Sequence, residues 1–455
     1  MFAKINFHDE FYQKLKLLVL PITMQQFMLA LVSATDAIML GAVSQTSLSA
    51  VSLAGQIQFV LNLFISGISA GSGIMAAQYW GKKDAASIEE VMPIALRTNL
   101  IFSGAFTVFA AVAPEVLMRI FTSDHALIES GAVYLRAVSL SYLLCGISQI
   151  YLILLKNTGY ATVSSRISCT AVVVNIICNA ILIYGLLGLP ALGIQGAAYA
   201  TVAARLVELI WSYLETKQSG RVQIIWKKMF RAADAVLTKD FWRYTTPVLG
   251  AALVWGIAYV SYSVIMGHMG SDAVAANSIT TIAKNVLSCL IRGVSGGAGV
   301  LIGNLLGAGE LDKAKVYGGR LTRMAIVVGM TTGGLLMLIS PLIVRFAPLS
   351  ETAAEYLQYM LIFCGCNIMA QSVNTTVLDG IFCAGGDSKF DMKGNLGAMW
   401  CFSVPFGFFA AFVLKWPVMV VYCIVNLDEI VKIPAVYLHY KKYIWVRNIT
   451  VQEEA

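Results

Sequence analysis

Long apolar segments separated by short polar loops are the feature that most restricts how this chain can fold. Hydrophobic residues make up 58% of its 455 residues and charged residues only 13%, against about 25% charged in ordinary globular proteins. Because a helix of about 20 apolar residues crosses the hydrocarbon core, and because lipid offers open backbone groups no partner, each segment is expected to be a membrane-spanning α-helix. There are twelve such segments, at about residues 16–42, 48–80, 92–113, 132–156, 165–188, 192–214, 243–268, 274–306, 318–343, 352–382, 394–414 and 417–440. The predicted fold class is an all-α membrane protein with twelve transmembrane helices.

The positive charge of the chain is distributed over its loops. The formal net charge is +7, but Lys and Arg are not gathered on one stripe, so nucleic acid is not an expected partner. Both ends of the chain and alternate loops are basic. In the opposite loops the only Lys and Arg residues are Arg119, Arg345 and Lys415. By the positive-inside rule, both termini of this multi-pass cell-membrane protein are expected in the cytoplasm. The first 20 residues lack a cleavage site and are expected to remain as a short interfacial helix.

The nine cysteines and four histidines are dispersed through the sequence. Their spacing matches neither a zinc site nor a disulfide framework. No glycine-rich loop ends in Lys-Ser or Lys-Thr, as a phosphate-binding loop requires. We therefore expect no cofactor and no tightly bound metal. The sequence also lacks the converging acids, bases or metal ligands of a membrane-embedded enzyme and the signalling appendage of a receptor, so neither class is expected.

An internal repeat with an offset of 226 residues runs through the sequence. The matching pairs are Pro21 and Pro247, Gly41 and Gly267, Ala50 and Ala276, Gly67 and Gly293, Gly71 and Gly297, Gly81 and Gly307, and Asp84 and Glu310. Each half holds six segments, and because six is even, both halves are expected to enter the membrane in the same orientation. Such halves form two six-helix bundles related by a pseudo-two-fold axis along the membrane normal. The predicted organisation is an N-lobe at 1–214, a cytoplasmic linker at 215–242, a C-lobe at 243–440 and a cytoplasmic tail at 441–455.

One carboxylate, Asp36, lies inside the first apolar segment, in the stretch SATDAIML. An ionised Asp at the centre of a bilayer costs about 2.5–3.5 kcal/mol even on insertion scales, so it requires a polar cavity, a partner or a proton. Intramembrane acids with this cost are functional candidates by default. Asp36 is therefore the leading candidate for an ion-coupling residue.

Five stretches of the sequence carry a family resemblance. They are TDAIMLGAVSQTSLSAVSLAGQI, GISAGSGIMAAQYWGKKD and VNIICNAILIYGLLGLPALGIQGAAYAT in the first half, and MGHMGSDAVAANSI and GVSGGAGVLIGNLLGAGELDKA in the second. Together they resemble the multidrug and toxic compound extrusion (MATE) family over nearly the whole chain. The resemblance implies a monomeric antiporter that exports small organic compounds, such as drugs and toxic metabolites, by alternating access. Protons or sodium ions would be the coupling ion.

The resemblance also assigns candidate residues for ion coupling. Asp36 matches the acid of the family's first helix, and Asn175 and Asn179 match its polar partners on the fifth. Their i, i+4 spacing places the two amides on one helix face, and Thr201 matches a hydroxyl of the sixth helix. These oxygens suit either a sodium ion or a hydrogen-bond network around a protonated acid. Some relatives have a second acid in place of Asn179, so sodium binding here would be weaker.

The second half departs from a better-known branch of the family. It lacks the Glu that those members carry in the seventh helix, and Tyr262 stands at the position that matches Asp36. Two cations, Lys284 and Arg292, have no acid on their own helix and are candidates to border the substrate cavity, although Lys284 could equally extend to the outer surface. Uncompensated, they predict a preference for zwitterionic or anionic amphiphiles over cations. The full set of cavity candidates is Gln26, Tyr262, Lys284, Arg292 and Asp379.

Other charged residues near the ends of the apolar segments are expected to pair on one helix face, namely Glu429 with Lys432 and Arg205 with Glu208. Lys284 and Arg292 also leave one alternative function open. A lipid-linked saccharide flippase of the same superfold would need basic residues for a pyrophosphate group. The lipid bilayer and a small-molecule substrate are the expected partners under either function.

Overall fold

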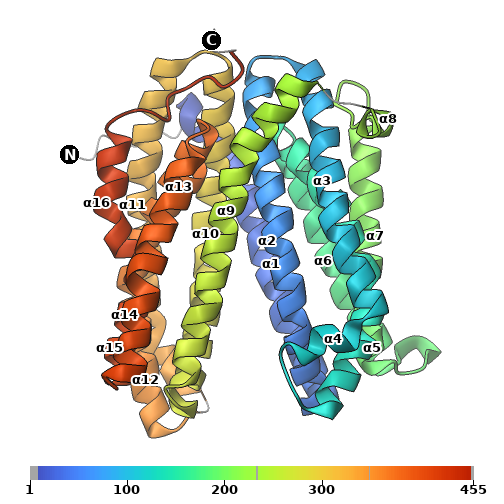
Figure 1. The fold of residues 1–455 in the computed structure, drawn as a ribbon, viewed down its shortest axis with the longest axis vertical. Helices are drawn as coiled ribbons and strands as arrows, with labels where there is room; N and C mark the ends of the chain where they lie inside the picture. Colours follow the sequence, from blue (N-terminus) through green and yellow to red (C-terminus); the bar gives the residue numbers. More distant parts are fainter. Residues whose placement is uncertain (1–8, 232–233, 348, 452–455) are drawn as a thin grey trace. The chain divides into compact units, whose positions relative to one another are not determined.

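The structure, a computed structural model, describes residues 9–231, 234–347 and 349–451. Within these ranges it contains helices and no strand. The helices of the first half are α1 (Glu10–Val43), α2 (Gln45–Gly81), α3 (Ala85–Val112), α4 (Pro114–Arg119), α5 (His125–Asn157), α6 (Ala161–Tyr184), the short η1 (Leu186–Gly188), α7 (Gly193–Thr216) and α8 (Trp226–Met229). Those of the second half are α9 (Ala235–Gly267), α10 (Ser271–Gly307), α11 (Leu311–Phe346), α12 (Glu351–Thr375), η2 (Thr376–Phe382), α13 (Ser388–Asn395), η3 (Leu396–Ser403), α14 (Val404–Phe408), η4 (Phe409–Val413), α15 (Val418–Val425) and α16 (Asp428–Tyr440). Figure 1 shows them along the chain.

Among the described residues, ten helices are long and apolar enough to cross a membrane by length and composition. The predicted sixth segment, 192–214, is the helix α7, which carries Arg205 and Glu208 and falls outside the ten. The predicted twelfth segment, 417–440, is divided between α15 and α16 at Asn426 and Leu427. The charged residues of α7 lower the hydropathy of the sixth segment, whereas the twelfth consists of two helices of 8 and 13 residues, each too short to cross a membrane. The first predicted segment has no separate interfacial helix after residue 9, because α1 is continuous from Glu10.

The 226-residue repeat extends to the helix boundaries. The helices α2 and α10 both contain 37 residues, and both their first and their last residues are 226 apart. The same offset relates the first residues of α3 and α11, and those of α5 and α12. It also relates two N-caps, because Asp124 accepts from backbone N–H groups at the start of α5 and Ser350 does so at the start of α12. The two halves therefore repeat their caps as well as their apolar pattern.

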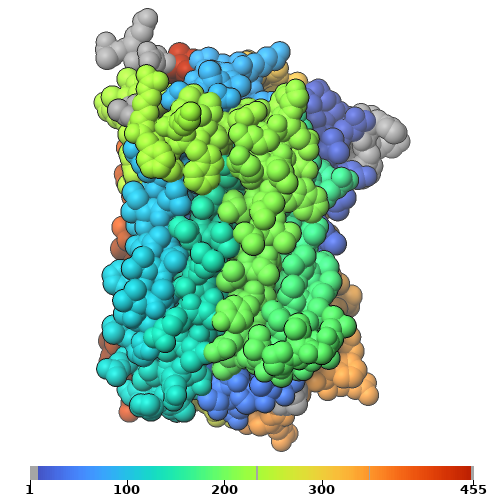
Figure 2. All heavy atoms as spheres, turned by 90° about the vertical axis from the view of Figure 1, so that its right-hand side faces the viewer, coloured from blue at the N-terminus to red at the C-terminus, as the bar shows by residue number. Residues whose placement is uncertain are grey.

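The described chain forms two compact units. Unit 1 contains the described residues of Met1–Gln26, Gly81–Lys83 and Gly250–Ala455, and unit 2 contains those of Phe27–Trp80 and Asp84–Leu249. In unit 1, α10, α11 and α12 pack side by side. In unit 2, α3, α5 and α7 do the same (Figure 2). The main boundaries between the two units lie inside α1 and α9. The predicted boundary between the lobes at 1–214 and 243–440 lies instead in the linker. That lobe division remains a prediction.

The first parts of α1 and α9 each pack in the unit formed mainly by the other half of the sequence. In unit 2, a Cβ atom added at Gly67 of α2 would lie 2.8 Å from the backbone of Leu249 in α9. In unit 1, a Cβ added at Gly293 of α10 would overlap the hydroxyl of Thr23 in α1 and lie 2.9 Å from the Cβ of that residue. Gly67 and Gly293 are 226 positions apart, and so are Thr23 and Leu249. The second contact is therefore the first one with the two halves of the sequence exchanged. Glycine is required at both positions because only its missing side chain permits this approach.

A second pair of close contacts repeats with the residue types exchanged. In unit 2, a Cβ added at Gly146 of α5 would lie 2.7 Å from the Cβ of Ser103 in α3. In unit 1, Gly329 is on α11 and the facing Ser372 is on α12, at 2.9 Å from an added Cβ. Each contact therefore combines one glycine and one serine, on opposite helices in the two units. Small residues at helix crossings allow this packing inside a membrane, where lipid is as apolar as the core.

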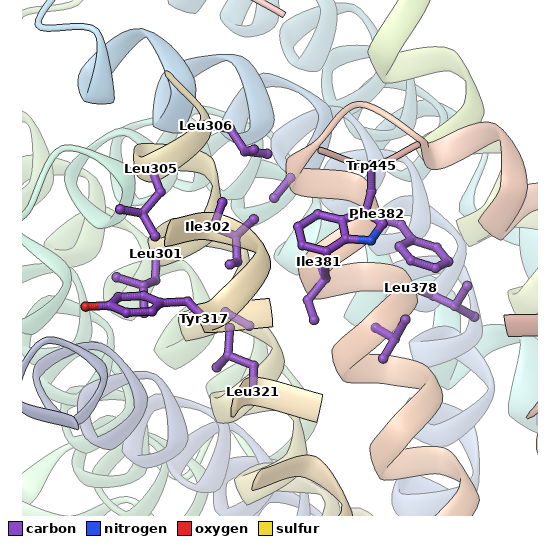
Figure 3. Packing of buried hydrophobic residues seen from close by; sticks show 14 of the residues in the cluster. Leu301, Ile302, Leu305, Leu306, Tyr317, Leu321, Leu378, Ile381, Phe382 and Trp445 are labelled. Carbon is purple, nitrogen blue, oxygen red and sulfur yellow. The ribbon is translucent and has the colours of Figure 1, made fainter. Parts of the chain in front are cut away.

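The core of unit 1 includes a residue from the predicted tail. Trp445 is fully buried, and Figure 3 shows its indole ring beside Phe382 and Ile381, close to the apolar side chains of α10 and α11. Farther along, Lys82 donates to the carbonyl of Thr450 at 3.1 Å. The part of the predicted tail from 441 to 451 is therefore folded against unit 1, while 452–455 lie outside the described residues.

The predicted linker, 215–242, contains the short helix α8. In α8, Trp226 Nε1 donates to the hydroxyl of Tyr151 at 2.7 Å, and Lys228 pairs with Glu90 at 2.7 Å. These contacts join α8 to α5 and α3 of unit 2. Positions 232 and 233 of the linker lie outside the described residues.

Candidate functional site

A polar cluster in unit 2 joins three helices around Asp36. Asn179 Nδ2 donates to Asp36 Oδ1 at 2.6 Å and to Asn175 Oδ1 at 3.1 Å. Asn175 Nδ2 in turn donates to Thr201 Oγ1 at 3.4 Å. The structure thus brings together Asp36 of α1, the two amides of α6 and the hydroxyl of α7. Both Asn side chains are buried and Asp36 is half-buried, so the carboxylate lies nearer the surface of unit 2 than the amides behind it.

A close helix approach at a glycine and one hydrogen bond position this cluster. A Cβ added at Gly196 of α7 would lie 2.6 Å from the backbone of Leu182 in α6, so α6 and α7 approach closely enough for their polar side chains to meet. Tyr184, the last residue of α6, donates its hydroxyl to the carbonyl of Met39 at 3.1 Å. Met39 lies one helical turn beyond Asp36 on α1. The end of α6 is therefore tied to the part of α1 that carries the acid.

A fifth residue at this cluster was not among the predicted site residues. Tyr134 of α5 hydrogen-bonds to Thr201 and interacts electrostatically with Asp36. It is buried within the apolar cluster that also contains Leu40 of α1. The available signal was weak, because a single Tyr in an apolar segment is more often a packing residue than a ligand.

The chemistry of the cluster follows from its oxygen atoms. The carboxylate of Asp36, the amide oxygens of Asn175 and Asn179 and the hydroxyl of Thr201 are hard ligands of the kind that alkali and alkaline-earth cations prefer. The Oδ1 atom of Asn179 is buried and has no hydrogen-bond partner among the described residues. No ion pair of Asp36 occurs within those residues either. The site therefore presents one uncompensated carboxylate and one unused oxygen acceptor.

A different polar cluster lies in unit 1, where the predicted pair of Glu429 and Lys432 is confirmed. Lys432 Nζ lies 3.0 Å from Glu429 Oε1, 3.4 Å from Asp428 Oδ2 and 3.2 Å from Asn395 Oδ1. Asn374 of α12 donates to Glu429 Oε2 at 2.8 Å. The side chain of Lys432 is only 5% exposed, so its charge is neutralised inside the protein. The pair predicted in α7, Arg205 and Glu208, also forms, at 2.6 Å.

All five cavity candidates lie in unit 1, whereas the cluster around Asp36 lies in unit 2. Lys284 is half-buried and interacts electrostatically with Asp428 and Glu429. Arg292 is exposed and interacts with Asp379, which lies on the π-helical segment η2. Neither cation forms an ion pair within the described residues, so the expectation that the two are uncompensated stays a prediction. Sequence spacing could test only for acids on the helix of the two cations, and it found none there.

The remaining two candidates are the uncharged residues Tyr262 and Gln26. Tyr262 of α9 is half-buried and interacts electrostatically with Asp428. Gln26, also half-buried, is on α1 at the edge of unit 1. Sequence reasoning missed Asp391 and Asn395, which are joined by a 3.0 Å hydrogen bond on α13. Their i, i+4 spacing was available as a signal, but they lie in a polar stretch that resembled a loop.

The architecture defines the class of protein first. It is a polytopic helical membrane protein built from two repeats, with a buried polar cluster in each unit. The sequence profile of the MatE family matches residues 21–181 and 247–409, so the two matches begin 226 residues apart, at Pro21 and Pro247. The chain belongs to this family, whose members are transporters that use ion gradients, and the predicted resemblance is confirmed.

Relatives and solved structures agree with this family. The chain is 22% identical over 417 residues to an uncharacterized transporter, YisQ, of Bacillus subtilis (strain 168), covering 91% of this chain and 90% of the relative. It is 24% identical over 355 residues to the probable multidrug resistance protein NorM of Agrobacterium fabrum, covering 76% and 73%. A crystal structure of MATE in complex with MaL6 matches with a TM-score of 0.86 at 18% identity, over 95% of this chain and 96% of that one.

A transporter of the MOP superfamily from Pyrococcus furiosus, whose binding pocket is described as having reverse polarity, matches with the same TM-score, 0.86, and identity, 18%, over 95% of each chain. These likenesses establish the fold. The protein has the twelve-helix, two-lobe transporter fold, which confirms the predicted all-α membrane fold class.

Proposed function

We propose that this protein is a secondary active antiporter that exports small organic compounds in exchange for protons or sodium ions by alternating access. The observation that carries the proposal is the Asp36 cluster. An intramembrane carboxylate has no ion-pair partner among the described residues, yet it has amide and hydroxyl neighbours. Such a carboxylate is a functional candidate by default, and an exchangeable cation would neutralise its charge. The names of the relatives, which describe probable multidrug resistance proteins, support drugs and toxic metabolites as the substrate class.

The cluster accommodates either coupling ion through the amide of Asn179. In the arrangement described above, Asn179 donates its N–H group to the carboxylate of Asp36. A flip of this amide exchanges its nitrogen and oxygen atoms. The unused Oδ1 atom then faces Asp36, where it accepts from a protonated carboxyl group or joins the carboxylate in binding sodium. The same three helices therefore hold the ion-loaded and ion-free states without a new ligand.

The proposal extends to the setting of the protein. It is a monomer in the cell membrane with both termini in the cytoplasm, as the basic loops favour. The substrate-cavity residues are Gln26, Tyr262, Lys284, Arg292 and Asp379. A lipid-linked saccharide flippase is less well supported, because Lys284 and Arg292 interact with acids of their own unit. A pyrophosphate group would have to compete with those carboxylates for both cations.

Transport into inverted membrane vesicles tests the coupling. A proton gradient and a sodium gradient are imposed separately, and uptake of a fluorescent organic substrate is followed. Wild-type protein is expected to respond to one of the two gradients, and Asp36→Asn to neither, because the change keeps the size of the side chain and removes its charge. Wild-type uptake by purified and folded Asp36→Asn under the same gradient would refute the assignment.

Cysteine labelling tests the orientation. Gln45 and Ser271 are exposed, begin α2 and α10 and are 226 residues apart. Cysteines at both positions are expected to react with an impermeant thiol reagent from outside intact cells. A cysteine at the exposed Ser219 of the linker is expected to react only after the membrane is opened. Reaction from outside at only one of the first two positions would overturn the parallel repeat.

A further inference from the structure

The ammonium group of Lys432 lies where an inorganic cation would find its ligands. Its three nearest partners are oxygen atoms, two from the carboxylates of Asp428 and Glu429 and one from the amide of Asn395, at 3.0–3.4 Å. They come from α13 and α16 and enclose a side chain that is 5% exposed. Carboxylate and amide oxygens are also the ligands that a bare alkali cation prefers. A lysine carries the same single charge on a flexible stem.

The ligands of this group are held in place independently of the lysine. Asn374 of α12 donates to both the side chain and the backbone carbonyl of Glu429, at 2.8 and 2.6 Å. Asn395 donates to Asp391 at 3.0 Å and accepts from the lysine through its oxygen. The Oδ1 atom of Asn374 is buried without a hydrogen-bond partner among the residues that the structure describes. Without the ammonium group, a further acceptor would therefore remain next to Glu429.

The two units also use the same helical spacing for a pair of polar side chains, two amides in unit 2 and a carboxylate with an amide in unit 1. In unit 2, Asn175 and Asn179 lie on one face of α6, the fifth segment of the first half. In unit 1, Asp391 and Asn395 lie at the same i, i+4 spacing on α13, which begins the fifth segment of the second half. Residues four apart lie on one face of a helix. In unit 2 this face meets a carboxylate, and in unit 1 it meets a lysine.

We propose that Lys432 is a tethered cation that permanently occupies a cation site in unit 1, so that only unit 2 has a site for an exchangeable ion. The occupancy of the unit 1 site stands on the contacts of Lys432 alone. The contrast with unit 2 rests on the proposed function of Asp36. Because the lysine is attached to α16, its charge cannot be exchanged for a free ion during a transport cycle. Removal of the ammonium group turns its carboxylates and amides into a site for free sodium.

The experiment measures sodium-dependent stability in purified protein. All variants carry Asp36→Asn, so that sodium cannot act at the unit 2 site and the result does not depend on transport. Melting temperatures are compared in sodium chloride and in N-methylglucamine chloride at the same concentration. The Lys432→Met variant is expected to melt about 1–2 °C higher in sodium, the size of effect that a weakly bound ion produces at several times its dissociation constant. Lys432→Arg, which keeps the charge, is the matched control and is expected to show no difference.

A third variant locates the ion. Adding Asn395→Ala to Lys432→Met removes one oxygen of the site and is expected to abolish the sodium effect. The proposal is overturned if sodium stabilises Lys432→Met and Lys432→Arg equally, or if the effect persists without Asn395. If Lys432→Met does not fold, it is replaced by the double variant Lys432→Met with Asp428→Asn, which loses one charge of each sign. The absence of a sodium effect in the double variant also overturns the proposal. Failure of the proposed function appears separately, in the vesicle experiment with Asp36→Asn alone.

Discussion

The polar clusters of the two units each surround a charged side chain, but only the cluster of unit 1 gives that charge an ion-pair partner within the described residues. In unit 2, Asp36 has amide and hydroxyl neighbours and no ion pair within the described ranges. In unit 1, Lys432 is held by two carboxylates and an amide oxygen. A buried charge is costly unless it is paired. Under the proposed function, the comparison teaches how two repeats of one fold can diverge, with one site neutralised from within and the other dependent on an ion from outside.

The difference predicts different consequences of mutation. Loss of charge in unit 2 is expected to leave the fold intact and remove function, because the site is built to exist with and without its ion. Loss of charge in unit 1 is expected to reduce stability, because the partner that remains is buried. The following predictions are ordered from the largest expected effect to the smallest.

The largest effect is expected in unit 1, from Glu429→Gln. This change leaves Lys432 with a single direct carboxylate, Asp428, at 3.4 Å. Removing one partner of a buried ion pair typically costs about 3–5 kcal/mol of unfolding free energy. Thermal unfolding of purified protein measures it, with Glu115→Gln, from an exposed pair with Arg136, as control. A melting temperature within error of the wild-type value would show that Lys432 does not depend on Glu429.

A smaller effect is expected in unit 2, from Asn179→Ala. It removes the hydrogen bond to Asp36 and one oxygen of the cluster, which is worth about 1–3 kcal/mol, or roughly 10-fold to 100-fold in affinity for the coupling ion. Asn175→Ala is expected to weaken ion affinity less, since Asn175 does not contact the carboxylate directly. Transport rates against ion concentration measure both. A larger loss of ion affinity in Asn175→Ala than in Asn179→Ala would contradict the geometry.

A change of selectivity is expected from Arg292→Gln. Arg292 interacts electrostatically with Asp379 in unit 1, so its loss removes one positive charge near that carboxylate and is expected to favour cationic substrates by a few-fold. The matched control, Arg292→Lys, keeps the positive charge and is expected to keep the wild-type preference. Competition between substrates of equal size and different charge measures the change. An unchanged order of preference in Arg292→Gln would remove Arg292 from the cavity.

The smallest effect is expected where an ion pair is partly exposed. A hydrogen bond from the backbone N–H of Phe11 and then the guanidinium of Arg320 lower the pKa of Asp9 below its ordinary value. A lowered pKa contributes stability that is present at neutral pH and is lost as the pH falls through the folded-state value, below about 4. Asp9→Asn is therefore expected to lower the melting temperature slightly at neutral pH and not at all in strong acid. A difference that grows on acidification would have the wrong sign.

The sequence predicted the repeated part of the fold closely. Matches such as Gly81 with Gly307 placed helix ends correctly, because glycines and caps act locally. The exchange of the first parts of α1 and α9 between the units could not be predicted. Thr23 and Leu249 are equivalent positions, and the sequence pattern fits packing within a half as well as packing across halves.

The sites were predictable to different degrees. Asp36 stood out because a single acid in an apolar segment is costly, and the family resemblance supplied its partners. Asp391 and Asn395 were missed because they lie in the polar stretch GGDSKFDMKGN, where helix α13 is stabilised by tertiary contacts instead of by its own hydropathy. Trp445 was missed for a related reason, since one aromatic residue in a basic segment gives no periodic signal.

The central claim is that Asp36 is the residue whose ion is exchanged for substrate. Ion release on addition of substrate to purified protein tests it most directly, with a pH indicator for protons and radioactive sodium for sodium ions. Wild-type protein and the control Glu115→Gln are expected to release one of the two ions when substrate binds, whereas folded Asp36→Asn is expected to release neither. Ion release from Asp36→Asn at the wild-type level would contradict the account.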